Sequence, residues 1–403
     1  MLSFQPAARM TSIDSFYVME IHREAVTLQS RAEAAGKPVI FICVGEPDFD
    51  AAPELMDAAD AAVRGGHTHY TVALGIMPLR EKIAALYQSR YGLAISPERI
   101  AVTAGASGAM LIAFGTLVNP GDEWLMPDPT YPCNRRFVSL YGGTTRLIPT
   151  GPAENYQLTA ALVEAHWGPQ TKGVMLATPS NPTGTMVSPA EMRAIHEVVR
   201  AKGGVLVVDE IYHGLTYETD AAGRFVEPPS ALANGEDLIV INSFSKYFTM
   251  TGWRLGWMVA PSAHMKALEK LAQNLFICPS SIAQEASLAC FSKASMALFE
   301  ERRREFRARR DYLVPALREL GFIVPHVPEG AFYVYADVSR FIANGFAKDS
   351  WEFCLNLLHQ AHVAISPGKD FGTHRADQHV RISYTMAIDQ LRHAIARMKA
   401  VLQ

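Results

Sequence analysis

Lys246 lies in the segment SFSKYFTMTGWR, which spans residues 243–254, and its neighbours suit an amine nucleophile. Ser243 precedes it by three residues, Arg254 follows it by eight, and most of the residues near it are apolar. Desolvation and a nearby cation both lower the pKa of a lysine, and the neutral amine attacks carbonyl carbon atoms. An ordinary surface cation is the commoner role for any one lysine, so the other motifs must decide between the two.

The elements around this segment predict an α/β fold. Short apolar runs bounded by Gly, Pro, Asp or Ser alternate with helical patterns, which is typical of βα units and a mainly parallel sheet. The candidate strands are Arg99–Thr103, Glu123–Met126, Thr171–Ala177, Gly204–Val208 and Leu238–Asn242. In open α/β sheets, ligands bind beyond the carboxyl ends of the strands, and Lys246 follows one of these ends. Between two of these strands, Ser188 and Glu191 predict a capping box for a helix that ends at Arg200.

Two other strand ends also carry groups that suit a ligand. The segment 103–108 (TAGASG) opens a predicted helix over 109–118, and the free backbone N–H groups at the start of this helix would suit a phosphate, although most turns of this kind bind nothing. Asp209 directly follows a buried strand, where an unpaired carboxylate is costly and needs a partner. A structural cap is the alternative for Asp209. We predict no metal site, because no cluster at ligand spacing accompanies this residue.

The sequence pattern changes after about residue 290. A long arginine-rich helix is predicted over 294–320, followed by strand-like segments at 330–337 and 379–383. We therefore predict a large domain over 45–290 and a small α+β domain over 291–403, to which the segment 1–44 is joined. The basic run 301–310 contains acids and helix formers, so we interpret it as a solvated helix face and not as a nucleic-acid site.

Composition restricts the possible partners and the location. The net charge is −3 and the pI is about 6.5, which favours neither nucleic acid nor an anionic membrane as a partner. Five scattered cysteines without a CxxC pair indicate reduced thiols. No apolar stretch reaches membrane-spanning length, and the N-terminus lacks the apolar region of a signal peptide. We predict a cytoplasmic protein.

The motifs together resemble the class I/II aminotransferases, which are pyridoxal-phosphate enzymes of fold type I, similar to aspartate aminotransferase. The resemblance covers most of the chain and implies a mainly parallel seven-stranded sheet flanked by helices. It implies that Lys246 holds pyridoxal 5'-phosphate as a Schiff base and serves as the catalytic base. Ser243, Arg254 and the backbone of Ala106 and Ser107 are then implied to bind the cofactor phosphate.

The same resemblance implies roles for residues around the cofactor ring. Asp209 pairs with the ring nitrogen, Tyr212 and Asn181 donate to the phenolic oxygen, and Tyr131 stacks on the ring. A carboxylate at the ring nitrogen keeps it protonated, so that the ring accepts electrons from the substrate.

Three further residues are implied to act in substrate binding and assembly. Arg381 grips the substrate α-carboxylate, which a planar guanidinium binds bidentately. Gly45 and Asn181 lie beside the substrate. Tyr70 reaches the cofactor phosphate of a partner subunit, which implies a homodimer with shared active sites.

We therefore predict an aminotransferase that moves an amino group from an L-amino acid to a 2-oxo acid by ping-pong chemistry. A β-eliminating C–S lyase on the same fold is the nearest alternative. A cofactor-sensing regulator is a second alternative, although only about 40 residues precede Gly45, too few for an added DNA-binding domain. Aliphatic, aromatic and acidic donors stay open, with 2-oxoglutarate or pyruvate as acceptor, because no motif locates a cation for a distal carboxylate.

Overall fold

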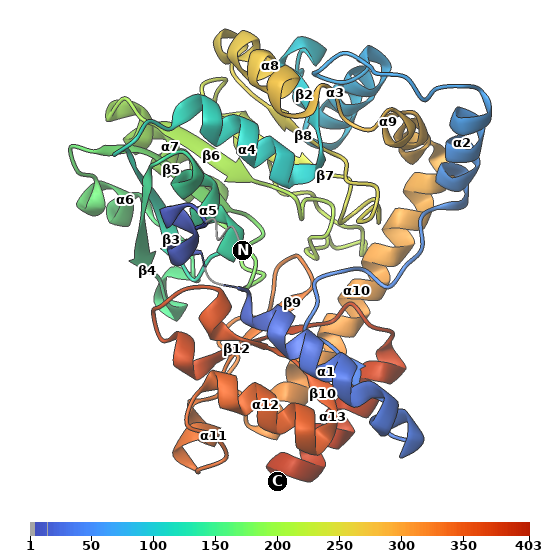
Figure 1. Ribbon diagram of the computed structural model, residues 1–403, viewed down its shortest axis with the longest axis vertical. Coiled ribbons are helices and arrows are strands. Elements are labelled where there is room, and N and C mark those ends of the chain that lie inside the picture. Colours follow the sequence, from blue (N-terminus) through green and yellow to red (C-terminus); the bar gives the residue numbers. More distant parts are fainter. Residues whose placement is uncertain (1–4, 14) are drawn as a thin grey trace.

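The chain is built in two parts that are joined by one long helix. The computed structural model describes residues 5–13 and 15–403. Figure 1 shows a large sheet with its helices in the upper part and two small sheets with their helices in the lower part. Helix α10 (Lys293–Leu320) runs from one part to the other. Among the described residues, no helix combines the length and the apolar character needed to cross a membrane.

The large sheet has seven strands in the order β2-β8-β7-β6-β5-β3-β4. Neighbouring strands from β7 to β4 are parallel, and β8 is antiparallel to both of its neighbours, β2 and β7. The prediction of a mainly parallel seven-stranded sheet is confirmed. The strands are β2 (Ile100–Thr103), β3 (Glu123–Asp128), β4 (Thr144–Pro149), β5 (Thr171–Ala177), β6 (Val205–Asp209), β7 (Ile239–Ser243) and β8 (Gly256–Val259).

All five strands predicted from the sequence form, with ends displaced by two residues or fewer. The two strands that were not predicted, β4 and β8, lack a continuous apolar run bounded by turn residues. Strand β4 lies at the sheet edge, its side chains are mostly exposed or half-buried, and it ends at Pro149, a residue that an edge strand tolerates. Strand β8 begins at Gly256, only two residues after Arg254.

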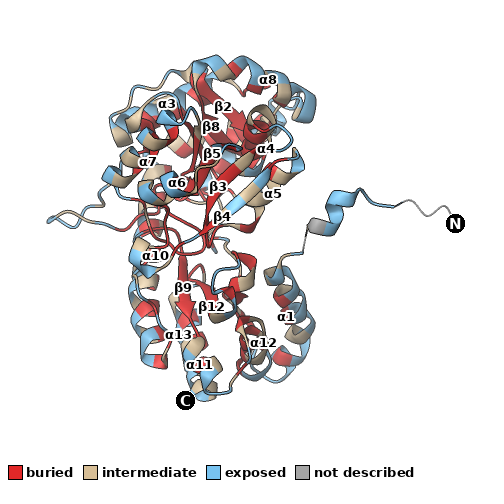
Figure 2. Cartoon of the chain, turned by 90° about the vertical axis from the view of Figure 1, so that its left-hand side faces the viewer, coloured by how far each residue is buried: buried red, intermediate tan, exposed pale blue. Residues whose placement is uncertain are grey.

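Helices cover both faces of the large sheet, and the strands alternate their side chains between the two helical layers. Met175, Val207 and Ile241 belong to the apolar cluster that includes helix α4 and helix α8. Their strand neighbours, such as Leu206, belong to a second cluster with α3 and α7. This period of two is expected for strands buried on both faces. Figure 2 shows the buried strands enclosed by helices whose outer sides are exposed. The helices of this part are α2 (Pro53–Arg64), α3 (Met77–Tyr91), α4 (Gly105–Leu117), α5 (Pro132–Leu140), α6 (Ala160–His166), α7 (Pro189–Ala201), α8 (Ser262–Phe276) and α9 (Ser281–Ser287).

Helix α7 begins as predicted, but its capping box does not form. The Oγ of Ser188 accepts the backbone N–H of Glu191 at 3.2 Å. The carboxylate of Glu191, however, accepts the backbone N–H of Ala160, the first residue of α6, at 2.6 Å. One acidic side chain therefore ties α7 to the N-terminus of α6, where a negative charge is favourable.

The lower part is formed by segments from both the N-terminal and the C-terminal regions of the chain. Strand β1 (Ile40–Phe41) pairs in parallel with β10 (Val363–Ala364), and β11 (Ser366–Pro367), β12 (His379–Ser383) and β9 (Tyr333–Asp337) form an antiparallel sheet. We therefore keep, as a proposal, the division into residues 1–44, 45–290 and 291–403, supported by the pairing of β1 with β10. The helices of this part are α1 (Tyr17–Ala34), α11 (Ser339–Ala343), α12 (Ser350–Ala361) and α13 (Ile388–Leu402).

Candidate active site

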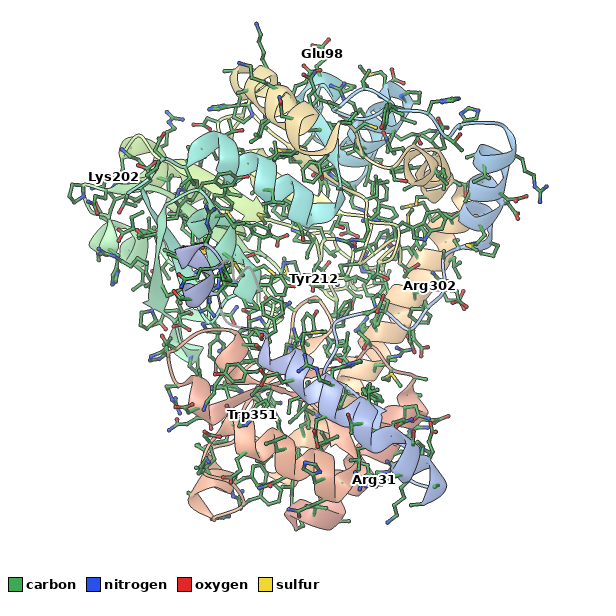
Figure 3. All side chains as sticks on the ribbon, in the orientation of Figure 1. Arg31, Glu98, Lys202, Tyr212, Arg302 and Trp351 are labelled. Carbon is green, nitrogen blue, oxygen red and sulfur yellow. The ribbon has the colours of Figure 1, made fainter. Side chains whose placement is uncertain are left out.

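A cavity of about 480 Å³ opens at the carboxyl edge of the large sheet and is closed on its other side by residues of the lower part. Figure 3 labels Tyr212 close to the level at which the two parts meet. The cavity is lined by most of the residues that the sequence predicts, namely Gly45, Ala106, Ser107, Tyr131, Asn181, Asp209, Tyr212, Ser243, Lys246, Arg254 and Arg381. Tyr70 is not brought to it: its side chain is 81% exposed and borders a separate hollow.

The topology explains why residues so far apart in the sequence meet here. Strands β6 and β7 are parallel neighbours, and they end at Asp209 and Ser243. Strand β2 runs in the same direction, so its end at Thr103 lies at the same edge, with Gly256 between it and Ser243. Lys246 follows Ser243 by three residues and turns back into this edge.

The amine of Lys246 is held in a partly buried position. Its Nζ donates to the carbonyl oxygen of Gly45 at 2.7 Å and lies 5.5 Å from the centre of the Phe332 ring. Burial, together with the charges of Arg381 and Arg254, lowers the pKa of Lys246 to about 8, against the opposing effect of nearby carboxylates. A substantial neutral fraction of this amine is therefore present near pH 8, as nucleophilic chemistry requires.

Asp209 offers a buried carboxylate to the same cavity. It is 6% exposed, and its Oδ1 accepts the backbone N–H of Ile211 at 3.1 Å. Burial raises the pKa of Asp209 to about 7, and the charge of Glu210 adds to this effect. A cationic ring nitrogen at this carboxylate would offset the cost of its burial, so the residue fits the cofactor that the resemblance implies.

The N-terminus of α4 and Arg254 together form an anion site. A Cβ added at Gly105 would lie 2.8 Å from Nη2 of Arg254, so the guanidinium lies directly against the start of the helix. A Cβ at Gly256 would lie 2.8 Å from the backbone nitrogen of Ala106, so only glycine lets strand β8 approach this close. Helix N-termini and arginine both favour phosphate, and the phosphate of the cofactor fits this cradle.

Ser245 also lines the cavity, although the sequence motifs did not single it out. The Oγ of Ser243 donates to the Oγ of Ser245 at 2.9 Å and also lies 3.2 Å from the carbonyl oxygen of Leu255. Both hydroxyls line the cavity beside the anion site. The repeated serine of the S-x-S-K motif was the available signal.

Arg381 is a buried cation that forms no close ion pair among the described residues, although the charge of Asp370 lies near it. It is 4% exposed, Nη1 donates to Oδ1 of Asn181 at 3.0 Å, and Nη2 donates to the carbonyl oxygen of Cys43 at 2.6 Å. Its Nε has no hydrogen-bond partner in the part of the chain that the structure describes. The guanidinium lies 4.4 Å from the centre of the Tyr333 ring and 4.8 Å from that of Phe371. A carboxylate would supply the missing negative charge.

Tyr333 on β9 is the second residue that the sequence reasoning missed. Its hydroxyl lies 2.9 Å from the hydroxyl of Tyr212, and both rings are buried. A Cβ on Gly45 would lie 1.8 Å from the Tyr333 hydroxyl, which requires glycine at that position. The alternation of segment 330–337 predicted a strand, but nothing in it showed which side chain faces the cavity.

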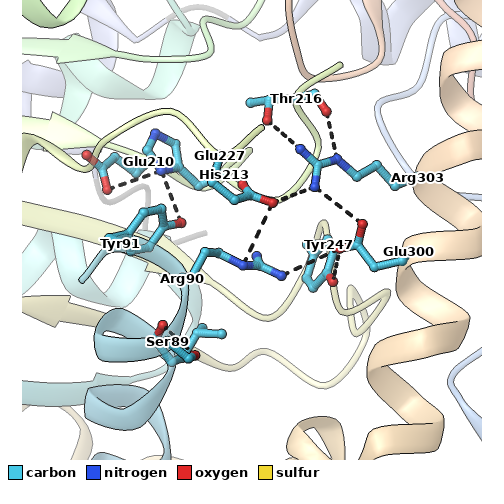
Figure 4. Close-up of polar contacts among 11 residues, drawn as sticks. Ser89, Arg90, Tyr91, Glu210, His213, Thr216, Glu227, Tyr247, Glu300 and Arg303 are labelled. Atoms are coloured by element: carbon cyan, nitrogen blue, oxygen red, sulfur yellow. Dashed lines mark hydrogen bonds and ion pairs between the residues drawn. The ribbon is translucent and has the colours of Figure 1, made fainter. Parts of the chain in front are cut away.

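A buried ionic network supports the loop that carries Lys246 (Figure 4). The hydroxyl of Tyr247 donates to Glu300 of α10 at 2.6 Å, and the guanidinium of Arg90 from α3 lies 4.4 Å from the Tyr247 ring centre. Arg90 and Arg303 each pair with Glu300, at 3.6 Å and 3.3 Å. The residue next to Lys246 is thus fixed between two helices of different parts of the sequence.

This network corrects the interpretation of the run 301–310 as a solvated helix face. Arg303 and Arg309 are 1% and 2% exposed. Arg303 donates to the backbone and hydroxyl of Thr216, and Arg309 pairs with Asp48 at 2.8 Å. The neighbouring Arg307 is partly exposed, so the run is solvated on one side only. Charge composition did not reveal which arginines face the other elements.

Comparisons with known proteins agree with this geometry. The family model for aminotransferase class I and II matches residues 37–398. A protein from Mycobacterium tuberculosis named valine–pyruvate aminotransferase is 37% identical over 391 residues, which covers 97% of each chain.

Solved structures give the same result for the fold. An aminotransferase from Mycobacterium tuberculosis superposes with a TM-score of 0.90 at 36% identity, covering 99% of each chain. An aspartate aminotransferase from Thermus thermophilus, solved with maleate, superposes with a TM-score of 0.89 at 31% identity, covering 99% of this chain and 100% of that chain.

Proposed function

The chain belongs to the class I and II aminotransferases, and from this membership we propose that Lys246 is its catalytic amine. The protein is a pyridoxal-phosphate-dependent enzyme that moves an amino group from an amino acid to a 2-oxo acid by a ping-pong mechanism. One observation supports the assignment above all. The amine of Lys246 lines the same cavity as the carboxylate of Asp209, and the pKa of Lys246 is lowered to about 8.

We propose that the sheet edge holds the cofactor through two groups of residues. Arg254, Ser243 and the backbone N–H groups of Ala106 and Ser107 bind its phosphate at the N-terminus of α4. Asp209, Tyr212, Asn181 and Tyr131 surround its ring. When bound, the cofactor supplies an electron-accepting ring that stabilises the negative charge left at the substrate Cα.

We propose that Arg381 and Lys246 divide the work on the substrate. Arg381 binds the α-carboxylate beside Asn181 and the backbone at Gly45, which fixes the orientation of the Cα–H bond. Lys246 then accepts the Cα proton at Nζ, because a neutral amine near its pKa is an efficient general base. The second half-reaction reverses these steps with a 2-oxo acid.

The alternative activities are less well supported. A β-eliminating C–S lyase is not favoured, because the relative and the solved neighbours are named aminotransferases. Their names leave the donor class open, since one is a valine–pyruvate enzyme and another is an aspartate enzyme that was solved with a dicarboxylate.

Borohydride reduction of the holoenzyme tests the assignment of Lys246. Reduction fixes the cofactor on the amine that holds it, and peptide mass spectrometry then locates the label. We expect a single labelled lysine, Lys246, with the label absent when apoprotein is reduced before the cofactor is added. A label on any other lysine would contradict the proposed site.

We also propose that the protein is a homodimer whose sites are shared. The loop with Tyr70 exposes Val72 (60%) and lies next to Ile277 (51%), since the backbone N–H of Thr71 donates to Sγ of Cys278 at 3.4 Å. Figure 2 shows that the first described residues, with the short helix Ala8–Ser12, extend away from the rest of the chain. An exposed apolar loop and a projecting N-terminal segment are features that a second copy would cover.

Subunit mixing tests the proposed role of Tyr70. We expect Tyr70→Phe to weaken cofactor binding about tenfold, because a hydrogen bond to a charged group is lost. A hybrid of one Tyr70→Phe subunit and one Lys246→Ala subunit contains one site with both native residues. At a cofactor concentration that leaves the Tyr70→Phe dimer mostly unloaded, the mixture should therefore show more activity than the sum of the two parent dimers. Activity equal to that sum would contradict shared sites.

A cytoplasmic location remains our proposal. All five cysteines are unpaired thiols, and Cys43, Cys290 and Cys354 are buried. Reduced thiols suit a reducing compartment.

A further inference from the structure

We infer that the amino donor carries an uncharged, apolar side chain and that donors with a distal carboxylate are disfavoured. The inference rests on the proposed function, because it takes Arg381 as the site of the α-carboxylate. It concerns the remaining walls of the same cavity, which neither the cofactor nor the α-carboxylate occupies.

The cations that this chain contributes to the cavity are already assigned. Lys246, Arg254 and Arg381 are the Lys and Arg side chains that line it within the described part of the chain. In the proposed function, Lys246 is the reacting amine, Arg254 binds the cofactor phosphate and Arg381 binds the α-carboxylate. A second substrate carboxylate would therefore find no free cation from these walls.

Two carboxylates line the same cavity and oppose a further negative charge. Glu46 accepts a hydrogen bond from Oγ1 of Thr251, and Asp370 is 3% exposed. Like charges in a partly buried space repel because the effective dielectric constant is low, although the charges of Arg381 and Arg135 offset part of the charge of Asp370. A donor with a distal carboxylate would meet these acids, whereas an apolar side chain would not.

The start of helix α1 supplies an apolar wall, and Asp370 fixes its position. The carboxylate of Asp370 accepts the backbone N–H groups of Tyr17 and Val18 at 2.7 and 2.8 Å. It thereby caps a helix that is distant in the sequence and places Phe16 and Val18 at the cavity.

The next residue after this acid extends the apolar wall to the α-carboxylate site. Phe371 lines the cavity, and its ring centre lies 4.8 Å from the guanidinium carbon of Arg381. A substrate held by Arg381 therefore lies beside an aromatic ring, with Phe16 and Val18 on the same cavity. This arrangement favours branched aliphatic or aromatic donors over charged ones.

A half-reaction screen tests the inference on the holoenzyme. The visible absorbance of the bound cofactor is followed after adding L-leucine, L-phenylalanine, L-alanine, L-aspartate or L-glutamate. We expect kcat/KM for leucine and phenylalanine to exceed that for aspartate and glutamate at least tenfold. A preference for the dicarboxylic donors would overturn the inference while leaving the proposed function intact. No conversion of any donor would instead count against the proposed function.

A variant of the apolar wall gives a second, independent test. Phe16→Ala should lower kcat/KM for leucine and phenylalanine about tenfold, while alanine, which does not reach the wall, should change less than twofold. Val26→Ala is the control, since Val26 lies on α1, the helix that Phe16 precedes, is 52% exposed and does not line the cavity. An equal loss for all three donors would show that Phe16 acts on the fold and not on specificity, and would overturn its assignment.

Discussion

Lys246→Ala should lower the rate of amino transfer by at least about 10⁴-fold, because it removes both the proposed covalent anchor of the cofactor and the proposed general base. The amine donates to the carbonyl oxygen of Gly45 at 2.7 Å and shares its cavity with Asp209 and Arg381. No other lysine among the described residues lines this cavity, so no neighbour replaces it. Steady-state transfer and the visible absorbance of the cofactor are the two measurements.

Lys202→Ala is the control for this variant. Lys202 lies on the surface of the molecule (Figure 3), 4.0 Å from Glu164, and exposed pairs of this kind contribute little to stability. We expect native activity and absorbance for it. An active Lys246→Ala enzyme with unchanged absorbance would refute the proposed role of Lys246.

The pH dependence of cofactor capture tests the same residue without a mutation. The pKa of Lys246 is lowered to about 8, so the reactive neutral amine is the minor form below this pH and the major form above it. The rate at which the apoprotein takes up pyridoxal phosphate should therefore rise with pH and level off above about 8. A rate that falls across this range would assign the step to a different group.

The large sheet was predictable because its central strands are apolar on both faces. A strand such as Thr171–Ala177 needs no alternation and is bounded by turn residues, so its limits matched the prediction. Strand β4 failed this test because it lies at the edge and is partly exposed, and its residues look like a polar loop. Strand β8 failed because it is short and adjoins the functional segment around Arg254.

The candidate site was predictable where a motif combines local order with special chemistry. Asp209 ends β6, Lys246 follows the end of β7, and Arg254 lies just before the antiparallel β8, so all three positions lie at one edge of the sheet. Tyr333 and Phe16 do not lie near the ends of the large-sheet strands, so this argument did not predict that they line the cavity. They reach the cavity through the packing of the lower part and of α1, which no local pattern specifies.

Which charged side chains are buried was the property that was hardest to predict from the sequence. Arg303 and Arg309 lie in a run whose composition is typical of a solvated helix, yet both are nearly inaccessible to solvent. Acids from other segments of the chain form ion pairs with them. Such pairs are long-range, so composition within a window cannot distinguish them from surface charges. The exposed Tyr70 is the converse case, since the partner proposed for it lies in a second copy of the chain.

Asp209→Asn should lower the rate of amino transfer about 10²- to 10³-fold while making the apoprotein more stable at alkaline pH. The loss of activity follows because a neutral amide does not hold the positive charge of the ring nitrogen, and a neighbouring carboxylate is worth about one to three pKa units to such a cation. The Asn side chain keeps an oxygen for the backbone N–H of Ile211, so the local structure has no reason to change.

The gain in stability follows from the pKa of Asp209, which is raised from 3.8 to about 7 by burial. Above pH 7 the folded apoprotein carries a buried charge that costs about 4 kcal/mol. At pH 5.5 the folded carboxyl is mostly protonated, and binding this proton costs about 2 kcal/mol relative to the unfolded chain. Because the folded pKa is the higher one, stability is lost as pH rises from 3.8 to 7, and the amide removes this loss. Urea unfolding of the apoproteins at one protein concentration should show the larger gain at pH 8.

Asp60→Asn, at a surface aspartate paired with Arg64 at 2.7 Å, is the control and should change stability by less than about 1 kcal/mol at either pH. An Asp209→Asn apoprotein that is less stable than the native one at pH 8, or equally stabilised at both pH values, would show that this carboxylate is not the strained buried charge that the cofactor must neutralise.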